Sequence, residues 1–155
     1  MGEICNSILE ILSLRKDAFF IIPMHKNNIV RNIIYEFLNN NPRIILTEPL
    51  KYDDLIATMK LSYFILTDSG GIQEEAPTLG KPVLVLRNKT EREEAIKAGC
   101  AKLVGTEKTQ IIQECMKLIN DELSYKRMSN INNPFGDGKA SYRILNICKE
   151  YLKIT

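Results

Sequence analysis

The sequence predicts an α/β fold, a Rossmann-like doubly wound parallel sheet in one domain. Short apolar runs alternate with segments of helical spacing, and this alternation is typical of a parallel sheet with helices on both faces. Length and composition agree, because 155 residues with 45% hydrophobic residues can bury one core of ordinary size. No internal repeat, low-complexity tract or linker is visible, so residues 1–155 are assigned to a single domain.

The elements follow one another in a regular order. A helix is expected over residues 3–14, and five candidate strands follow at residues 18–22, 43–46, 63–67, 82–86 and 101–104. Three sets of apolar residues recur at helical spacing between or after these strands: Ile29, Val30, Ile33, Ile34, Phe37 and Leu38; Leu55, Ile56 and Met59; and Ile111, Ile112, Cys115, Met116 and Ile119. Helix ends are expected at Asn39-Asn40-Asn41-Pro42 and at Gly80, with Pro82 just beyond it.

Composition and charge exclude several classes of protein. The chain carries 21 basic and 19 acidic residues, with no dense basic cluster, so we expect no nucleic-acid partner. The longest apolar run, residues 18–24, is far below the ~20 residues that span a bilayer, and no signal peptide is visible. The four cysteines, widely spaced at 5, 100, 115 and 148, are interpreted as free thiols in the cytoplasm. Neither a metal site nor a cofactor is predicted.

The most informative segment is the stretch from Thr67 to Pro77, TDSGGIQEEAP. It follows an apolar strand and opens a short helix, at the carboxyl edge of the sheet where ligands of open α/β folds bind. The turn Ser69-Gly70-Gly71 exposes backbone N–H groups at the positive end of that helix, where a phosphate is held well. Glu75, one turn later, has the carboxylate that accepts hydrogen bonds from ribose hydroxyls. Taken alone, the turn is equally well explained as a strand-to-helix junction with glycines for steric reasons.

Five motifs together resemble a known family. They are residues 68–77 (DSGGIQEEAP), 79–85 (LGKPVLV), 90–94 (TEREE), 23–27 (PMHKN) with Val30-Arg31, and 133–138 (NPFGDG). In their order along the chain they closely resemble the non-hydrolysing UDP-N-acetylglucosamine 2-epimerases, and the resemblance runs from about residue 3 to about residue 151. It implies the second, UDP-binding domain of a GT-B enzyme, in which two Rossmann-like domains face each other across a cleft.

The resemblance also implies roles for individual residues. Ser69, Gly70 and Gly71 would bind the diphosphate of UDP, and Glu75 the ribose hydroxyls. Arg92 would supply positive charge near the phosphates, and residues 50–55, Leu55 among them, would cradle the uracil. These roles suit the groups, because N–H donors and a guanidinium bind anionic oxygens and a carboxylate binds a diol.

The implied reaction inverts C2 of the sugar and interconverts UDP-N-acetylglucosamine and UDP-N-acetylmannosamine for cell-surface polysaccharide synthesis. UDP is eliminated with the C2 proton and then added back after reprotonation from the other face. The acid–base carboxylates of the family lie in its first domain, so no catalytic residue is assigned in this chain. We therefore expect no turnover from this chain alone.

The chain departs from the family pattern at its start. The family's second domain opens with a strand and a His-Arg-Arg-Glu-type loop, which precede the region matched here. That strand lies in the middle of a 3-2-1-4-5-6 sheet, so residues 18–22 and 63–67 are expected to be separated. Three outcomes are open: the halves pair directly, a partner supplies a strand, or the chain folds poorly. We expect a marginally stable chain prone to association.

Other polar residues have simpler explanations beside the functional ones. His25, the only histidine, matches a family position near an effector site, but it is also typical of a solvated loop. Asp68 is expected to cap the helix or hold the loop, and Asp53 and Asp54 to begin a helix. Residues 133–138 are interpreted as a turn, preferably a loop at the cleft.

Three functions remain open. The first is the UDP-binding part of a 2-epimerase, joined by a separate chain carrying the first domain or forming a homodimer. The second is a UDP-sugar-binding subunit of a two-chain glycosyltransferase, and the third is a non-catalytic UDP-sugar sensor. The segments 90–94 and 133–138 favour the first.

Overall fold

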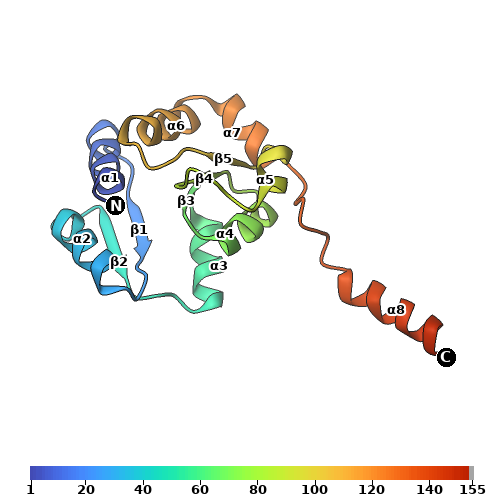
Figure 1. Cartoon of the computed structure of the whole chain (residues 1–155). Coiled ribbons are helices and arrows are strands. Elements are labelled where there is room, and N and C mark those ends of the chain that lie inside the picture. Colours follow the sequence, from blue (N-terminus) through green and yellow to red (C-terminus); the bar gives the residue numbers. More distant parts are fainter. Residues whose placement is uncertain (154–155) are drawn as a thin grey trace.

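The computed structural model describes residues 1–153 and contains the five expected strands (Figure 1). The strands are β1 (Phe20–Pro23), β2 (Ile44–Thr47), β3 (Ile65–Thr67), β4 (Val83–Val85) and β5 (Ala101–Leu103). The helices are α1 (Gly2–Leu14), α2 (Asn28–Leu38), α3 (Tyr52–Leu61), α4 (Gly70–Glu75), η1 (Ala76–Leu79), α5 (Glu93–Ala98), α6 (Lys108–Asn120), α7 (Glu122–Ser129) and α8 (Ala140–Leu152). The α/β fold class with parallel strands is thus confirmed.

The strands form two separate parallel sheets. β1 pairs with β2, and β4 lies between β3 and β5 in the second sheet. Within residues 1–153 no strand ladder joins β1 to β3, so the halves do not pair directly, which was one of the three outcomes considered. We call residues 2–47 the two-stranded half and residues 52–129 the three-stranded half.

The three-stranded half buries its sheet on both faces. Val83 and Val85 of β4 pack with Met59 of α3 and Ala95 of α5. Leu84, whose side chain points to the opposite face, packs against a cluster on α1 and α6: Ile11, Ile111, Cys115 and Leu118. Side chains of a strand alternate between the faces, so a central parallel strand is apolar throughout.

The two-stranded half is covered on one face only. The buried cluster comes from both helices and from β2, and includes Cys5, Ile8, Leu12, Ile34, Leu38 and Ile44. Ile21 and Ile45 are neighbours in the parallel register and lie on the opposite face, where they are 38% and 50% exposed. Parallel sheets normally have helices on both faces, so this bare apolar face is unusual.

Helix α1 connects the halves. It packs along α6 at the top of Figure 1, and Ile4 of α1 and Phe20 of β1 contact the apolar clusters of both halves. The two sheets are therefore held in one molecule by helix packing and not by strand hydrogen bonds.

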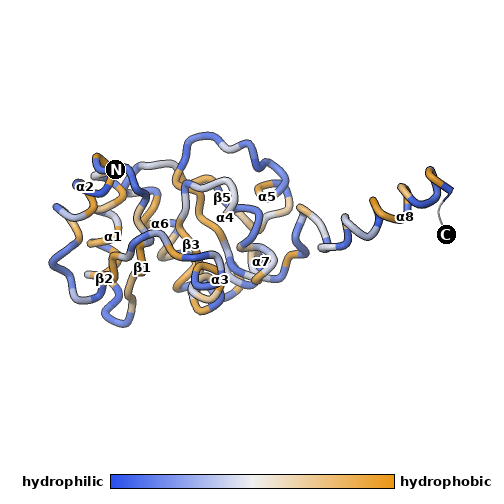
Figure 2. Tube along the Cα trace, turned by 90° about the horizontal axis from the view of Figure 1, so that it is seen from below, coloured by the Kyte–Doolittle hydropathy of each residue, from blue (hydrophilic) through white to orange (hydrophobic). Residues whose placement is uncertain are grey.

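Helix α8 projects away from the body, a feature that the sequence analysis did not anticipate (Figures 1 and 2). None of its residues is buried, and its exposed apolar side chains are Tyr142, Ile144, Leu145, Ile147, Tyr151 and Leu152. Figure 2 shows apolar and polar residues alternating along it, as in an amphipathic helix without a partner. No helix in the described part of the chain is long and apolar enough to cross a membrane.

Two smaller expectations are confirmed. α2 ends at Leu38, and Gly80 ends η1 with a φ of +64°, a conformation that glycine adopts without strain. Asp53 and Asp54 lie in the first turn of α3, where negative charge is favourable.

Candidate functional site

The turn between β3 and α4 lies at the carboxyl edge of the three-stranded sheet. Ser69 is the residue before α4, in an extended conformation, and Gly70 and Gly71 are the first helical residues. The hydroxyl of Thr67 accepts a hydrogen bond from the N–H of Ser69 at 3.0 Å and fixes the turn. Asp68 is exposed and makes no side-chain hydrogen bond among the described residues, so the loop-tying role expected of it belongs to Thr67.

The guanidinium of Arg92 lies directly over Gly70. A Cβ atom at Gly70 would be 3.2 Å from Cζ and Nη2 of Arg92 and 3.2 Å from Oε1 of Glu91, whereas one at Gly71 would meet only the Ser69 hydroxyl, at 4.0 Å. Neither glycine has a positive φ. A side chain at Gly70 would therefore displace the guanidinium of Arg92 by a few tenths of an ångström, whereas the backbone conformation itself would tolerate it.

Carboxylates flank this arginine. Nε of Arg92 donates to Glu74 at 2.5 Å, and Nη1 lies 3.1 Å from Glu91, which also pairs with Arg87 at 3.3 Å. Arg92 remains about one-third exposed, so an anion can reach it from the solvent. The structure thus brings Arg92 against the Ser69-Gly70-Gly71 turn, as the resemblance implied.

Glu75 faces a different space. With Tyr52, Ile56, Thr78 and Leu79 it lines a cavity of about 300 Å³ between α3 and η1. An apolar wall beside a carboxylate is an arrangement that suits a ring with hydroxyl groups attached. Leu55 is half-buried against the core of the three-stranded half, and its neighbours Tyr52 and Ile56 line the cavity instead.

The segment 133–138 begins against α4 and η1. The Asn133 amide donates to the carbonyl of Glu74 at 3.2 Å and to the hydroxyl of Thr78 at 2.5 Å, while Phe135 packs on the core. The loop interpretation of this segment agrees with its backbone, since Gly136 and Gly138 both have positive φ.

His25 lies in the two-stranded half, on the exposed loop after β1. Its Nδ1 accepts a hydrogen bond from the N–H of Asn27 at 3.1 Å, and Asn27 in turn caps α2. Nearby, the hydrogen-bonded Arg31 holds the pKa of the Glu48 carboxyl below its usual value. His25 is thus not among the residues gathered at the Arg92 turn. In residues 1–153, no group of three or more His, Cys, Asp and Glu side chains is placed to hold a metal ion.

The sequence analysis gave no role to Gln73 and Thr90, which the structure links to the turn at Ser69. The side chain of Gln73 is fully buried, and it joins the carbonyl of Ser69 to the hydroxyl of Thr90. Gln73 lies four residues after Ser69, the spacing of one helical turn, which is the only local signal for the first of these contacts.

A family profile described as UDP-N-acetylglucosamine 2-epimerase matches residues 1–149. The chain belongs to the UDP-N-acetylglucosamine 2-epimerase family. A relative of that name from Campylobacter jejuni is 49% identical over 145 residues, which are 94% of this chain and 38% of the relative. One from Bacillus subtilis is 45% identical over 94% of this chain and 38% of its own length.

Solved structures of family members superpose on almost the whole chain. The S. aureus protein MnaA, solved with UDP, has a TM-score of 0.94 and 47% identity, covering 99% of this chain and 42% of that protein. The Neisseria meningitidis 2-epimerase, bound to UDP-GlcNAc, has a TM-score of 0.91 and 46% identity over 96% of this chain and 40% of that protein. The chain therefore spans about two-fifths of the length of these relatives.

Proposed function

We propose that this chain is the nucleotide-binding, C-terminal part of a cytoplasmic UDP-N-acetylglucosamine 2-epimerase, an isomerase that interconverts UDP-GlcNAc and UDP-ManNAc. The observation that carries the proposal is the guanidinium of Arg92 over Gly70, beside a helix start with free N–H groups. Relatives 46–47% identical to this chain were solved with UDP and with UDP-GlcNAc.

Each group then has a defined task. The hydroxyl of Ser69, the N–H groups of Gly70 and Gly71 and the guanidinium of Arg92 bind the diphosphate, while the N–H of Ser69 stays bonded to Thr67. Glu75 accepts hydrogen bonds from the ribose hydroxyls, and the first turns of α3 border the uracil, with Tyr52 and Ile56 at the cavity and Leu55 behind them in the core. As UDP leaves the sugar, the same donors stabilise the charge that develops on its phosphate.

Calorimetry with UDP tests the site through two neighbouring glycines. Gly70→Val forces a branched side chain into the guanidinium, and Glu75→Ala removes the ribose acceptor, so each should weaken binding tenfold or more, about 1.4 kcal/mol. Gly71→Ala is the matched control, since its Cβ meets only the Ser69 hydroxyl at 4.0 Å. Wild-type affinity in both Gly70→Val and Glu75→Ala would falsify the site assignment.

We further propose that polypeptide outside this chain completes both the sheet and the active site. A strand between β1 and β3 would pair their free edges, and a second domain would supply the acid–base carboxylates on the other side of the sugar. The bare face at Ile21 and Ile45 and the unpartnered α8 offer apolar surface for that contact. The completing segment can come from the same protein, a separate chain or a second copy.

A reconstitution experiment tests this completion. The chain alone should give no epimer from UDP-GlcNAc by NMR, because misplacing groups by about 1 Å already costs around a hundredfold. Adding the first domain with the preceding strand should restore turnover and raise the melting temperature. Turnover by the purified chain alone would contradict the proposal, as would a concentration-independent melt above about 60 °C that the segment leaves unchanged. Glycosyl transfer with a partner would support the two-chain transferase instead.

A further inference from the structure

Two uncharged side chains connect the turn at Ser69 to the loop that carries Arg92. Nε2 of Gln73 donates to the carbonyl of Ser69 at 3.1 Å, and its Oε1 accepts from the Thr90 hydroxyl at 2.7 Å. The same hydroxyl oxygen accepts the backbone N–H of Arg92 at 3.1 Å. A chain of three hydrogen bonds thus runs from Arg92 through Thr90 and Gln73 to Ser69.

The direction of each bond is fixed by the chemistry of its partners. A threonine hydroxyl has one hydrogen, which goes to the Gln73 carbonyl, so its lone pairs are left to accept from Arg92. Gln73 is fully buried, so any bond it lost would leave an amide group unpaired inside the protein. The connection therefore resists local rearrangement.

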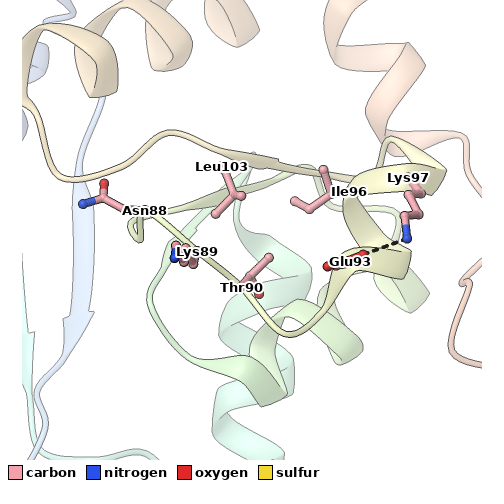
Figure 3. A pocket seen from close by; sticks show the side chains of 7 residues that line it. All are labelled: Asn88, Lys89, Thr90, Glu93, Ile96, Lys97 and Leu103. Carbon is pink, nitrogen blue, oxygen red and sulfur yellow. Dashed lines mark hydrogen bonds and ion pairs between the residues drawn. The ribbon is translucent and has the colours of Figure 1, made fainter.

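Packing alone does not hold the Arg92 loop in place. A cavity of about 380 Å³ lies behind the loop. Figure 3 shows Asn88, Lys89 and Thr90 on its loop side and Ile96 and Leu103 on the other. Asn88 and Lys89 are themselves exposed. Two polar contacts therefore tie the loop to α4: the ion pair between Arg92 and Glu74 at the guanidinium, and the buried bond between Thr90 and Gln73, which fixes the backbone through the N–H of Arg92.

We infer that Gln73 and Thr90 are positioning residues that hold Arg92 over Gly70 and so preorganise the anion site. The inference rests on the proposed UDP site and adds to it two residues that need not touch the ligand. A guanidinium fixed in advance gives up less freedom when a phosphate binds, which raises affinity. Gln73 and Thr90 are 17 residues apart and follow two different strands, so their bond aligns two edges of one site.

Hydrogen exchange tests the connection without any ligand. Thr90→Val keeps the shape of the side chain and removes the hydroxyl, so the N–H of Arg92 loses its acceptor and should exchange at least tenfold faster. Thr90→Ser retains the hydroxyl and should protect Arg92 as the natural chain does. The amides of β4 serve as an internal control and should be unchanged in both variants. Unaltered exchange at Arg92 in Thr90→Val would overturn the inference whether or not UDP binds.

A double-mutant cycle with UDP tests the consequence for binding. Thr90→Val and Gln73→Leu should each weaken UDP binding by about tenfold, with Thr90→Ser close to the natural affinity. In an Arg92→Ala background, Thr90→Val should change the affinity less than twofold, because the group it positions is gone. An equal loss in both backgrounds would mean that Thr90 supports the fold only. Failure of the natural chain to bind UDP would contradict the proposed function, and the exchange at Arg92 would still decide the positioning role.

Discussion

The two halves of the molecule differ in how completely they bury their sheets. In the three-stranded half every residue of β4 is 0% exposed, whereas in the two-stranded half Ile21 and Ile45 leave an apolar face in contact with solvent. The half that carries the Arg92 turn therefore has a closed core, one face of which is completed by Ile11 of α1. The other half depends on α1, on its packing against α6, and on whatever covers its bare face.

This difference matters for function, because binding sites need rigid support. The Ser69 turn follows a strand whose neighbour β4 is buried on both sides, so the backbone that presents the N–H groups is fixed by the core. The two-stranded half carries His25 on an exposed loop and none of the groups gathered around Arg92. We expect it to be the more easily opened half, and three measurements can contradict or refine this expected difference.

Paired core and face substitutions should show the largest difference. Leu84→Ala leaves a cavity at the centre of the three-stranded half and should lower the free energy of unfolding by about 2–5 kcal/mol. Ile45→Ala, on the half-exposed face, should cost less than about 1 kcal/mol, because little area returns to water. Urea unfolding with a common m-value measures both. Equal costs would indicate that the face is covered, for example by a second copy of the chain.

Substitution of Arg43 is expected to have the next largest effect on the free energy of unfolding, confined to the two-stranded half. Its guanidinium donates to the carbonyls of Leu12 at 2.7 Å and Arg15 at 2.8 Å, and so ties the end of α1 to β2. Arg43→Met should cost about 1–3 kcal/mol, the range for hydrogen bonds to charged groups. Asp17→Asn breaks only an exposed ion pair and is the control.

The readout for Arg43 is hydrogen exchange at β2 compared with β4. Faster exchange at β2 alone would show that the two halves open separately. Equal acceleration in both strands would mean that the two halves unfold as one unit. They would then differ in how their sheets are covered but not in their free energy of opening.

Local patterns in the sequence were enough for the fold class, and each of the five strands overlaps its predicted range. The turn at Ser69 and the role of Arg92 near it depended on motif resemblance, since nothing local brings Arg92 back to Gly70. The connection from Gln73 to Thr90 was not predicted for the same reason: it joins the helix after β3 to the loop after β4, and only the parallel sheet brings them together. Tyr52 lies within the range 50–55 expected at the uracil, whereas Ile56 was missed because the cavity-facing side of α3 follows from where that helix begins and how it packs.

The labelling rates of the four cysteines measure the smallest difference expected between the two halves. Cys5 lies in the two-stranded half and Cys100 and Cys115 in the three-stranded half, all at 1% exposure or less, while Cys148 on α8 is exposed. We expect iodoacetamide to label Cys148 first, and Cys5 about tenfold faster than Cys115, which corresponds to about 1.4 kcal/mol in the free energy of opening. Mass spectrometry of timed samples gives the four rates, and labelling in urea should make them similar.

The pH dependence of this labelling tests whether burial is what protects the thiols. Burial raises the pKa of the Cys115 thiol to about 12, and also raises that of Cys5, whose shift the positive N-terminus opposes. A free thiol ionises near 8.5, so the buried neutral Cys115 contributes stability that is complete below about pH 8.5 and is lost as pH rises toward 12. Between pH 7 and 8 Cys115 should therefore stay protected, with its labelling accelerating above pH 9. Labelling of Cys115 before Cys5 at pH 7.5 would reverse the order of the two halves, and would mean that the closed core around β4 opens more readily than the half with the bare face.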